Sequence, residues 1–289
     1  MTSSNQAAPR IAVVIPCFND GTTLPEAVES TRAQEPCEVV VVDDGSSEPG
    51  TIEILRRLED AGVRVVRQEN KGLALARMAG VAATASRYVY PLDADDRLAP
   101  GVLTKLADAL DNDPDGAVAW GNVQMFGDVD YLWRRSGHLD PWRIIHVNPL
   151  PMSSLIRRSA LLEAGGWELR GGYEDWDLWM AFAERGFKGV YVPELMLLYR
   201  IHGQRMFVDA AGRHDRIYAE LRRRHPSLWQ HRFQRWLRSP SRWRLKLTYP
   251  VIAALPFLSL SNKRRLFHFV VHPGNVTRAG LRRLRSRRS

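Results

Sequence analysis

Cysteine is scarce in this chain of 289 residues, which contains only Cys17 and Cys37. A secretion signal is missing as well, because residues 1–10 contain no apolar core segment of the kind that a signal peptide requires. Without such a signal, we expect both cysteines to be reduced thiols rather than a disulfide. These absences indicate a cytoplasmic protein.

Acidic residues are nearly absent from the C-terminal quarter. Residues 213–289 contain 20 Lys and Arg but only 2 Asp and Glu. Residues 1–212 contain 21 Lys and Arg and 30 Asp and Glu. The formal net charge of +9 therefore combines an acidic main part with a strongly basic tail. The tail is the part that would meet polyanions.

The tail also lacks an apolar run that could span a membrane. Residues 247–260 are apolar but include two prolines and fall short of the ~20 residues of an ordinary span. With Trp236 and Trp243 nearby and basic residues on both sides, this segment suits the surface of an anionic membrane leaflet. A helical extension packed on the main domain is the alternative. We expect no nucleic-acid binding, because no nucleic-acid module is visible.

Short apolar runs alternate with stretches of helical spacing along the rest of the chain. Strands are predicted at residues 11–15, 38–42, 63–66, 88–92 and 117–123. Helices are predicted at residues 24–31, 50–60, 73–81, 101–111, 159–164 and 175–185. We expect residues 124–150 to be loop and short strand, and residues 191–200 to be extended. The alternation predicts an α/β fold with a mostly parallel sheet flanked by helices.

Polar loops follow successive strands at residues 16–22, 43–47, 67–72 and 93–97. Because parallel strands end at the same edge of a sheet, this edge is predicted to carry the functional site.

The strongest chemical signal is the group Asp93, Asp95 and Asp96, which follows a buried strand. Three carboxylates within four positions repel one another, which favours a bound cation. Carboxylate oxygens suit Mg²⁺ or Mn²⁺, and these ions often share their coordination with substrate phosphates. An acidic turn before the next helix would also explain these residues. A calcium-binding loop fits poorly, since Leu98 and Thr104 stand where it needs Gly and Glu.

Several short motifs surround this group in a fixed order. They are Ile15-Pro16-Cys17-Phe18-Asn19, Val42-Asp43-Asp44-Gly45-Ser46, Asn70-Lys71-Gly72 with Ala76-Arg77, Asp93-Ala94-Asp95-Asp96, Gly165-Gly166-Trp167, Glu174-Asp175-Trp176-Asp177 and Tyr199-Arg200-Ile201-His202. In this order and spacing the chain resembles the family 2 glycosyltransferases, inverting enzymes with the GT-A fold. The resemblance covers about residues 10–205. It predicts a disordered segment 1–9, a GT-A domain at 10–212 and a basic helical extension at 213–289.

The resemblance implies a site for a nucleotide-diphosphate sugar, with a UDP-sugar favoured. It assigns the metal, Mn²⁺ or Mg²⁺, to Asp95 with Asp96 and His202, and the metal would neutralise the leaving diphosphate as a Lewis acid. Which of Asp95 and Asp96 ligates stays open, and a surface-loop histidine is the alternative for His202. Asp93 would lie near the ribose or sugar, with Ala94 beside it.

The remaining donor contacts come from three further motifs of the resemblance. Pro16 and Phe18 would flank the nucleobase, and Asp44 with Asp43 would hydrogen-bond the edge of the base. Asn19 is also placed among the donor-binding residues. A plain strand-to-helix turn is the alternative reading of Asp43 and Asp44.

Gly72 and Arg77 would contact the donor's sugar or phosphate. Many relatives have Asn after this Arg, and Met78 stands there instead, which puts that donor contact in doubt. Trp167 would form an aromatic wall, although a core position would suit it as well.

Inversion requires a carboxylate that takes the proton of the acceptor hydroxyl during in-line attack. The resemblance assigns this role to Asp175, and such a base typically contributes ~10²–10⁴-fold. The resemblance places the neighbouring Glu174 among the residues that bind the donor. An N-terminal helix carboxylate that satisfies the helix dipole is the plain alternative for this pair.

The sequence thus predicts a metal-dependent inverting glycosyltransferase acting on a glycan or lipid-linked acceptor in cell-envelope polysaccharide biosynthesis, peripheral at the inner face of the membrane. A nucleotidyltransferase acting on a sugar phosphate is the main alternative; it would not need Asp175 and would release pyrophosphate. A non-catalytic nucleotide-sugar-binding scaffold at the membrane is the other, and the intact carboxylate set speaks against it.

Overall fold

The computed structural model describes residues 8–134, 138–202 and 213–255, together with residues 258, 262, 263, 266, 267 and 270. The chain forms two compact units. The first comprises Met1–Leu139 and Leu150–Arg205, and the second comprises Asp140–Pro149 and Met206–Ser289. The segment Asp140–Pro149 therefore belongs with the C-terminal residues, although it interrupts the first unit in the sequence.

The first unit contains a single mixed sheet. Its strands are β1 (Ile11–Cys17), β2 (Glu38–Asp43), β3 (Arg64–Arg67), β4 (Tyr88–Pro91), β5 (Arg97–Leu98), β6 (Gly116–Gly127), β7 (Tyr131–Trp133), β8 (Leu155–Arg157) and β9 (Lys188–Ile201). They lie in the order β3-β2-β1-β4-β8-β6-β9-β5, and β7 pairs with β6. Strands β1 to β4 are mutually parallel, whereas β8 runs antiparallel to both β4 and β6.

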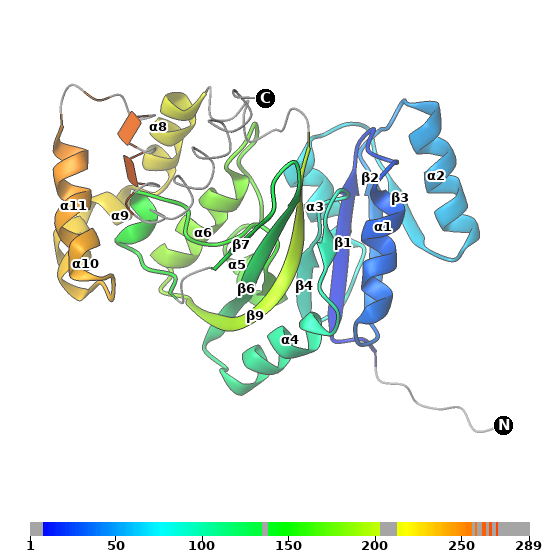
Figure 1. Cartoon of the computed structure of the whole chain (residues 1–289), viewed down its shortest axis with the longest axis horizontal. Helices are drawn as coiled ribbons and strands as arrows, with labels where there is room; N and C mark the ends of the chain where they lie inside the picture. The colour runs from blue at the N-terminus through cyan, green and yellow to red at the C-terminus, as the bar shows by residue number, and fades with distance from the viewer. Residues whose placement is uncertain are drawn as a thin grey trace, which may run out of the picture. The chain divides into compact units, whose positions relative to one another are not determined.

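Helices flank this sheet, as Figure 1 shows for the blue-to-green part of the chain. They are α1 (Leu24–Ser30), α2 (Pro49–Asp60), α3 (Leu73–Ala82), α4 (Val102–Asn112), α5 (Arg158–Glu163) and α6 (Glu174–Glu184), with the short 3-10 helix η1 (Thr31–Ala33). Helix α3 packs on β1 and β2, and α4 packs on β6 and β9.

The central strands form because their residues are apolar on both faces. All seven residues of β1 are buried, as are all four of β4, which is typical of parallel strands covered by helices on each side. Helix α3 approaches them closely at Gly80, where an added Cβ would lie 2.2 Å from Cγ1 of Val14. A small residue is therefore required at this point of the helix.

The second half of the sheet differs from the sequence-based expectation. Strand β6 continues to Gly127 beyond the predicted end at residue 123, and β9 runs unbroken through Pro193. The β6–β9 pairing contains register irregularities near Trp120 and Asn122; a bulge allows such a long pair to bend. The short strands β5 and β8 were not predicted, because two or three residues carry too little periodicity.

The second unit is helical. It contains η2 (Arg143–Ile145), α8 (His214–Arg224), α9 (Pro226–Gln230), α10 (Arg232–Arg238) and α11 (Trp243–Ala254), drawn from green to orange in Figure 1. Its core comprises Trp142, Tyr249, Ile252 and Phe267. Ser239 and Ser241 donate hydrogen bonds of 2.5 and 2.7 Å to Oδ2 of Asp140. These bonds fix the inserted segment to the C-terminal helices.

A membrane-spanning helix would need more length or apolarity than any helix in the described part of the chain has. Cys17 and Cys37 are both free thiols, as the sequence predicts. Burial raises the pKa of each thiol to about 11.

Candidate active site

The polar loops after β1, β2 and β4 meet at one edge of the sheet, because these strands run parallel to one another. Asp43 ends β2 and pairs with Cys17 of β1. The acidic group 93–96 follows β4, the neighbour of β1 on the other side. The arrangement is the one that the sequence pattern predicts for a ligand site at the carboxyl ends of parallel strands.

Arg77 joins two of the predicted site residues. Its Nη2 donates a 2.7 Å hydrogen bond to Oδ1 of Asp93, and its Nη1 donates a 2.9 Å bond to Oε1 of Glu174. The three residues come from α3, the loop after β4 and the first turn of α6. A single guanidinium therefore fixes the distance between the acidic loop and the helix that carries Asp175.

The Arg77 side chain is only 1% exposed. Burial alone would lower its pKa, but the charges of Asp93 and Glu174 and their hydrogen bonds raise the pKa above the usual value. Trp167 is buried too, and the guanidinium lies 5.9 Å from the centre of its ring. Trp167 and the guanidinium of Arg77 thus pack together in the interior, and the two carboxylates Asp93 and Glu174 compensate the buried charge.

Asp95 and His202 bring an oxygen and a nitrogen donor together. Nε2 of His202 lies 3.0 Å from Oδ2 of Asp95, and both side chains are partly exposed. Burial and the charge of Asp93 raise the pKa of Asp95, whereas the hydrogen bond with His202 opposes that rise.

Asp96 is different, since its side chain is wholly buried. Its Oδ1 accepts a 2.8 Å hydrogen bond from the backbone N–H of Arg200, and the Arg200 side chain donates to the backbone oxygen of Asp95 and to Glu26. Burial and the neighbouring charges of Asp95 and Asp93 raise the pKa of Asp96 well above its usual value. These contacts tie the acidic loop to β9, which ends just before His202.

A divalent cation suits this donor set only if a ligand completes its coordination. Within the residues that the structure describes, no three His, Cys, Asp or Glu side chains form a metal cluster. Asp95 and His202 supply two donors, and the buried Oδ2 of Asp96 has no hydrogen-bond partner. A carboxylate with an imidazole is acceptable to Mn²⁺, and the remaining positions are those that phosphate oxygens and water occupy in such sites. The residues fit the ion.

Asp44 fastens the loop that precedes α3. Its Oδ1 accepts hydrogen bonds from Nε2 of Gln68 at 2.6 Å and from the N–H of Lys71 at 2.8 Å, and its Oδ2 accepts one from the N–H of Gly72 at 2.8 Å. Gly72 has a φ of 87° and precedes the first residue of α3. Asp44 therefore orients the loop and the helix that carries Arg77.

Asn19 and Asp43 organise the first two loops in a similar way. Asn19 has a φ of 52°, and its Oδ1 accepts hydrogen bonds from the N–H groups of Ser47 and Glu48. Oδ1 of Asp43 accepts a 2.9 Å hydrogen bond from the N–H of Ser46. Asn19 thus joins the loops after β1 and β2, and Asp43 shapes the loop after β2 from within.

Three further predicted residues lie along the same edge. Pro16 is a buried residue of β1, and Ala94 is buried within the acidic loop. Phe18 is 49% exposed directly after β1. An exposed ring at the mouth of the edge is available to stack on a planar ligand.

Asp175 lies in the first turn of α6, one residue after Glu174. Its Oδ1 accepts a 2.8 Å hydrogen bond from the N–H of Trp176, and its side chain is partly exposed whereas Glu174 is buried. The residue before α6, Tyr173, has a φ of 62°. The strained turn and the Arg77–Glu174 pair together set the position of Asp175.

Met78 accounts for the departure from the family pattern in packing terms. An added Cβ on Gly166, whose φ is +75°, would lie 2.4 Å from Sδ of Met78. The thioether therefore packs against the glycine turn that precedes Trp167.

The model of the family described as "Glycosyl transferase family 2" matches residues 12–164, and the chain belongs to this family. Glycosyltransferase GlyG of Streptococcus pneumoniae is 33% identical over 124 residues, which cover 42% of this chain and 41% of GlyG. The chain spans less than half the length of the first curated relatives that it matches.

Solved structures confirm the fold. The S. aureus TarS fragment 1–349 in complex with UDP-GlcNAc has a TM-score of 0.57 at 18% identity, covering 90% of this chain and 87% of that one. The mannosyltransferase PcManGT from Pyrobaculum calidifontis in complex with GDP-Man and Mn²⁺ has a TM-score of 0.57 at 17% identity, covering 92% and 85%. The predicted α/β fold with flanking helices, that of GT-A glycosyltransferases, is thereby confirmed.

Two contributors to the site were not among the predicted site residues. Arg200 lies in the Tyr199–His202 motif, two residues before the predicted metal ligand His202. This position in the motif could have indicated a role in the site. Glu26, which accepts a 2.6 Å hydrogen bond from Arg200, lies in α1 far away in sequence. No local pattern marks such a partner.

Proposed function

We propose that this protein is a metal-dependent inverting glycosyltransferase that transfers a sugar from a nucleotide-diphosphate sugar, a UDP-sugar by preference, to a hydroxyl of a glycan or lipid-linked acceptor. One observation carries the proposal. Buried Arg77 joins the acidic loop to the start of α6, so that Asp93 and the turn carrying Asp175 face one edge of the sheet in a chain of this family.

Asp175 acts as the general base in this proposal. Its partly exposed carboxylate stands at the start of α6, and the acceptor hydroxyl gives its proton to this carboxylate as it attacks the anomeric carbon. Attack from the side opposite the leaving diphosphate inverts the configuration. Glu174 is buried and paired with Arg77, whereas the carboxylate of Asp175 is partly exposed. Of the two adjacent carboxylates, Asp175 is therefore the one that an acceptor hydroxyl can reach.

The donor side of the site rests on the other loops. Asp93 is fixed by Arg77 and oriented toward the donor's ribose or sugar, and Phe18 stacks on the nucleobase. Asp44 and Asn19 keep the surrounding loops in place through the bonds described above. Asp95 and His202 would hold the cation, and Asp96 and the backbone oxygen of Asp95 are both bonded to Arg200, which orients Asp95. When bound, the cation would neutralise the charge of the departing diphosphate.

The second unit supports association with an anionic membrane surface. Helix α11 exposes Trp243, Leu247 and Val251, which repeat every four residues and so form one stripe on the helix. The basic residues of the C-terminal quarter surround this stripe in the sequence. Apolar insertion combined with Arg–lipid attraction is the usual basis of interfacial binding. This arrangement favours an acceptor presented at a membrane surface.

Release of nucleoside diphosphate from a panel of UDP-, GDP- and dTDP-sugars tests the transferase proposal. We expect slow hydrolysis of one donor with Mn²⁺ or Mg²⁺, loss of the reaction with chelator, and loss in Asp95→Asn. Asp60→Asn is the matched control, because it removes an exposed carboxylate of α2. Calorimetry provides the second readout; absence of metal-dependent binding for every donor would refute the proposal, and release of pyrophosphate would favour a nucleotidyltransferase.

A further inference from the structure

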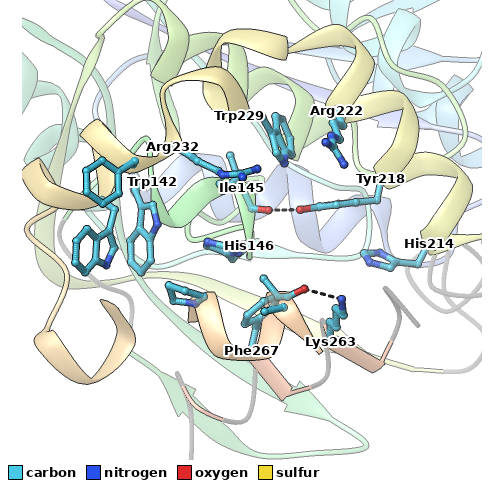
Figure 2. A pocket seen from close by; sticks show the side chains of 15 residues that line it. Trp142, Ile145, His146, His214, Tyr218, Arg222, Trp229, Arg232, Lys263 and Phe267 are labelled. Atoms are coloured by element: carbon cyan, nitrogen blue, oxygen red, sulfur yellow. Dashed lines mark hydrogen bonds between the residues drawn. The ribbon is translucent and has the colours of Figure 1, made fainter. Parts of the chain in front are cut away.

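The helical second unit contains a pocket that the proposed transfer reaction does not use. Its volume is about 650 Å³, within the range of about 300–1,000 Å³ that small-molecule sites occupy. All of its lining residues belong to the second unit. Figure 2 shows Trp229 between Arg222 and Arg232 on one wall, with Lys263 and Phe267 across from them.

The interior of this pocket is apolar. Trp142, Trp236, Phe267 and Ala254 line it, and several polar groups of the wall are already bonded within the protein. The Tyr218 hydroxyl donates to the backbone oxygen of Ile145, Nε1 of Trp236 donates to that of Lys246, and Nζ of Lys263 donates to that of Ala253. Among the described residues of the wall, a ligand inside meets few free hydrogen-bonding groups.

His146 adds to this apolar character. Its ring contacts those of Trp142, Tyr249 and Phe267 at centroid distances of 5.3, 5.1 and 5.0 Å. The imidazole is therefore enclosed by aromatic rings, which suits its neutral form.

Positive charge gathers around the pocket. Arg222 and Arg232 line it and are exposed, and Lys263 lines it from the other side. Neither arginine forms an ion pair among the described residues, whereas neighbouring Arg223 is paired with Glu220 at 2.6 Å. Two guanidinium groups beside an apolar interior are complementary to a ligand with one anionic head and an apolar body.

The pocket is continuous with the apolar surface of α11. Pro250, Ala253 and Ala254 line the pocket, whereas Leu247 and Val251 of the same helix are exposed. Ala254 lies three positions after Val251. Because an α-helix has 3.6 residues per turn, these two residues are neighbours on the surface of α11. Phe233 both lines the pocket and is 66% exposed. The pocket therefore opens beside the surface that we assign to the membrane.

We propose that this pocket binds a lipid phosphate, with the end of one apolar chain among the aromatic rings and the phosphate bound by the guanidinium groups of Arg222 and Arg232. A nucleotide is the competing ligand, since aromatic rings and arginines also bind bases and phosphates. The few free hydrogen-bonding groups of the wall favour the lipid, because they leave the edge of a base unpaired. Binding there is independent of transfer, and it can be measured without a sugar donor.

Calorimetric titration of the full chain with a long-chain alkyl monophosphate below its micellar concentration tests the proposal. We expect binding of this probe, at least about tenfold weaker binding of the matching alcohol, and none of inorganic phosphate. Arg222→Gln/Arg232→Gln should weaken the alkyl phosphate at least about tenfold, as loss of a charge-assisted hydrogen bond does. Arg216→Gln/Arg238→Gln removes the same charge from exposed residues outside the pocket and should leave the affinity unchanged.

Two further variants separate the pocket from the exposed surface. Ala254→Trp fills the pocket and should abolish alkyl phosphate binding, whereas Leu247→Ser/Val251→Ser should leave it unchanged. Equal binding of alcohol and phosphate, equal loss in both arginine pairs, or displacement of the probe by UMP would overturn the proposal. Donor binding in Arg222→Gln/Arg232→Gln should equal that of the unchanged chain, which keeps failure of this inference distinct from failure of the transferase proposal.

Discussion

At the scale of single residues, the charge of Arg77 is the most consequential feature of the first unit. Its guanidinium is buried between Asp93 and Glu174, and removal of one partner from a buried ion pair leaves the others uncompensated. We expect Arg77→Met to lower the free energy of unfolding by about 3 kcal/mol, measured by urea unfolding. Arg56→Met, which removes two exposed ion pairs of α2, should have no measurable effect on the free energy of unfolding. Equal stability of both variants would contradict the buried-pair account.

Asp175 allows a prediction about rate rather than stability. Asp175→Asn keeps the size of the side chain and removes the base, so we expect kcat to fall by about 10²–10⁴-fold. Calorimetric donor affinity should stay within a factor of two or so, because the proposed role involves only the acceptor hydroxyl. Asp177→Asn alters another carboxylate of the same turn and serves as the comparison. Unchanged turnover in Asp175→Asn would remove the residue from the mechanism.

His146 predicts a pH dependence for the second unit. Burial lowers its pKa to about 3, whereas an unfolded chain has a histidine pKa of about 6.5. Below that value the unfolded state binds a proton that the folded state does not. The free energy of unfolding is therefore unaffected by protonation of His146 above pH 6.5 and falls between pH 6.5 and pH 3, by up to about 1.4 kcal/mol per pH unit.

His146→Leu removes this proton. Urea unfolding of the variant and the unchanged chain, followed by tryptophan fluorescence between pH 7 and pH 4, should show the variant gaining relative stability as the pH falls. A difference that stays constant over this range would show that His146 does not titrate in this way.

At the scale of elements, helix α3 packs closely on the sheet because Gly80 has no side chain. A Cβ on Gly80 would lie 2.2 Å from Val14 and 3.1 Å from Val42. We expect Gly80→Ala to cost about 1–3 kcal/mol of stability through overpacking and to weaken donor binding, because α3 carries Arg77. Gly50→Ala in α2 is the matched control, since nothing lies within 4 Å of the added Cβ. It should be neutral or stabilising.

At the scale of the whole molecule, the exposed apolar residues are unevenly distributed. Of the large hydrophobic residues exposed in the described part of the chain, Phe233, Leu237, Trp243, Leu247, Val251 and Leu266 lie in the second unit. We expect Trp243→Ser/Leu247→Ser/Val251→Ser to reduce co-sedimentation with anionic vesicles several-fold, and salt to reduce it further by screening the basic residues. Ile52→Ser/Leu162→Ser, which alters exposed positions of the first unit, should sediment like the unchanged chain.

Much of this molecule follows from its sequence alone. Short apolar runs and helical spacing predict most strands and helices of the first unit, because both patterns lie within a few consecutive residues of the chain. The ordered motifs predict the family, and the polar loops predict the edge of the sheet that carries the site.

Other features are decided only by the tertiary structure, because they depend on residues that are far apart in the chain. Nothing near Arg77 in the sequence indicates that it will be buried between Asp93 and Glu174, or that Asp96 will hold β9 while Asp95 faces His202. The pocket of the second unit arises in the same way, since Trp142 and His146 join helices that begin about seventy residues later. The periodicity of a sequence predicts which face of a helix or strand is buried. Which residues pack against that face depends on how the whole chain packs in three dimensions.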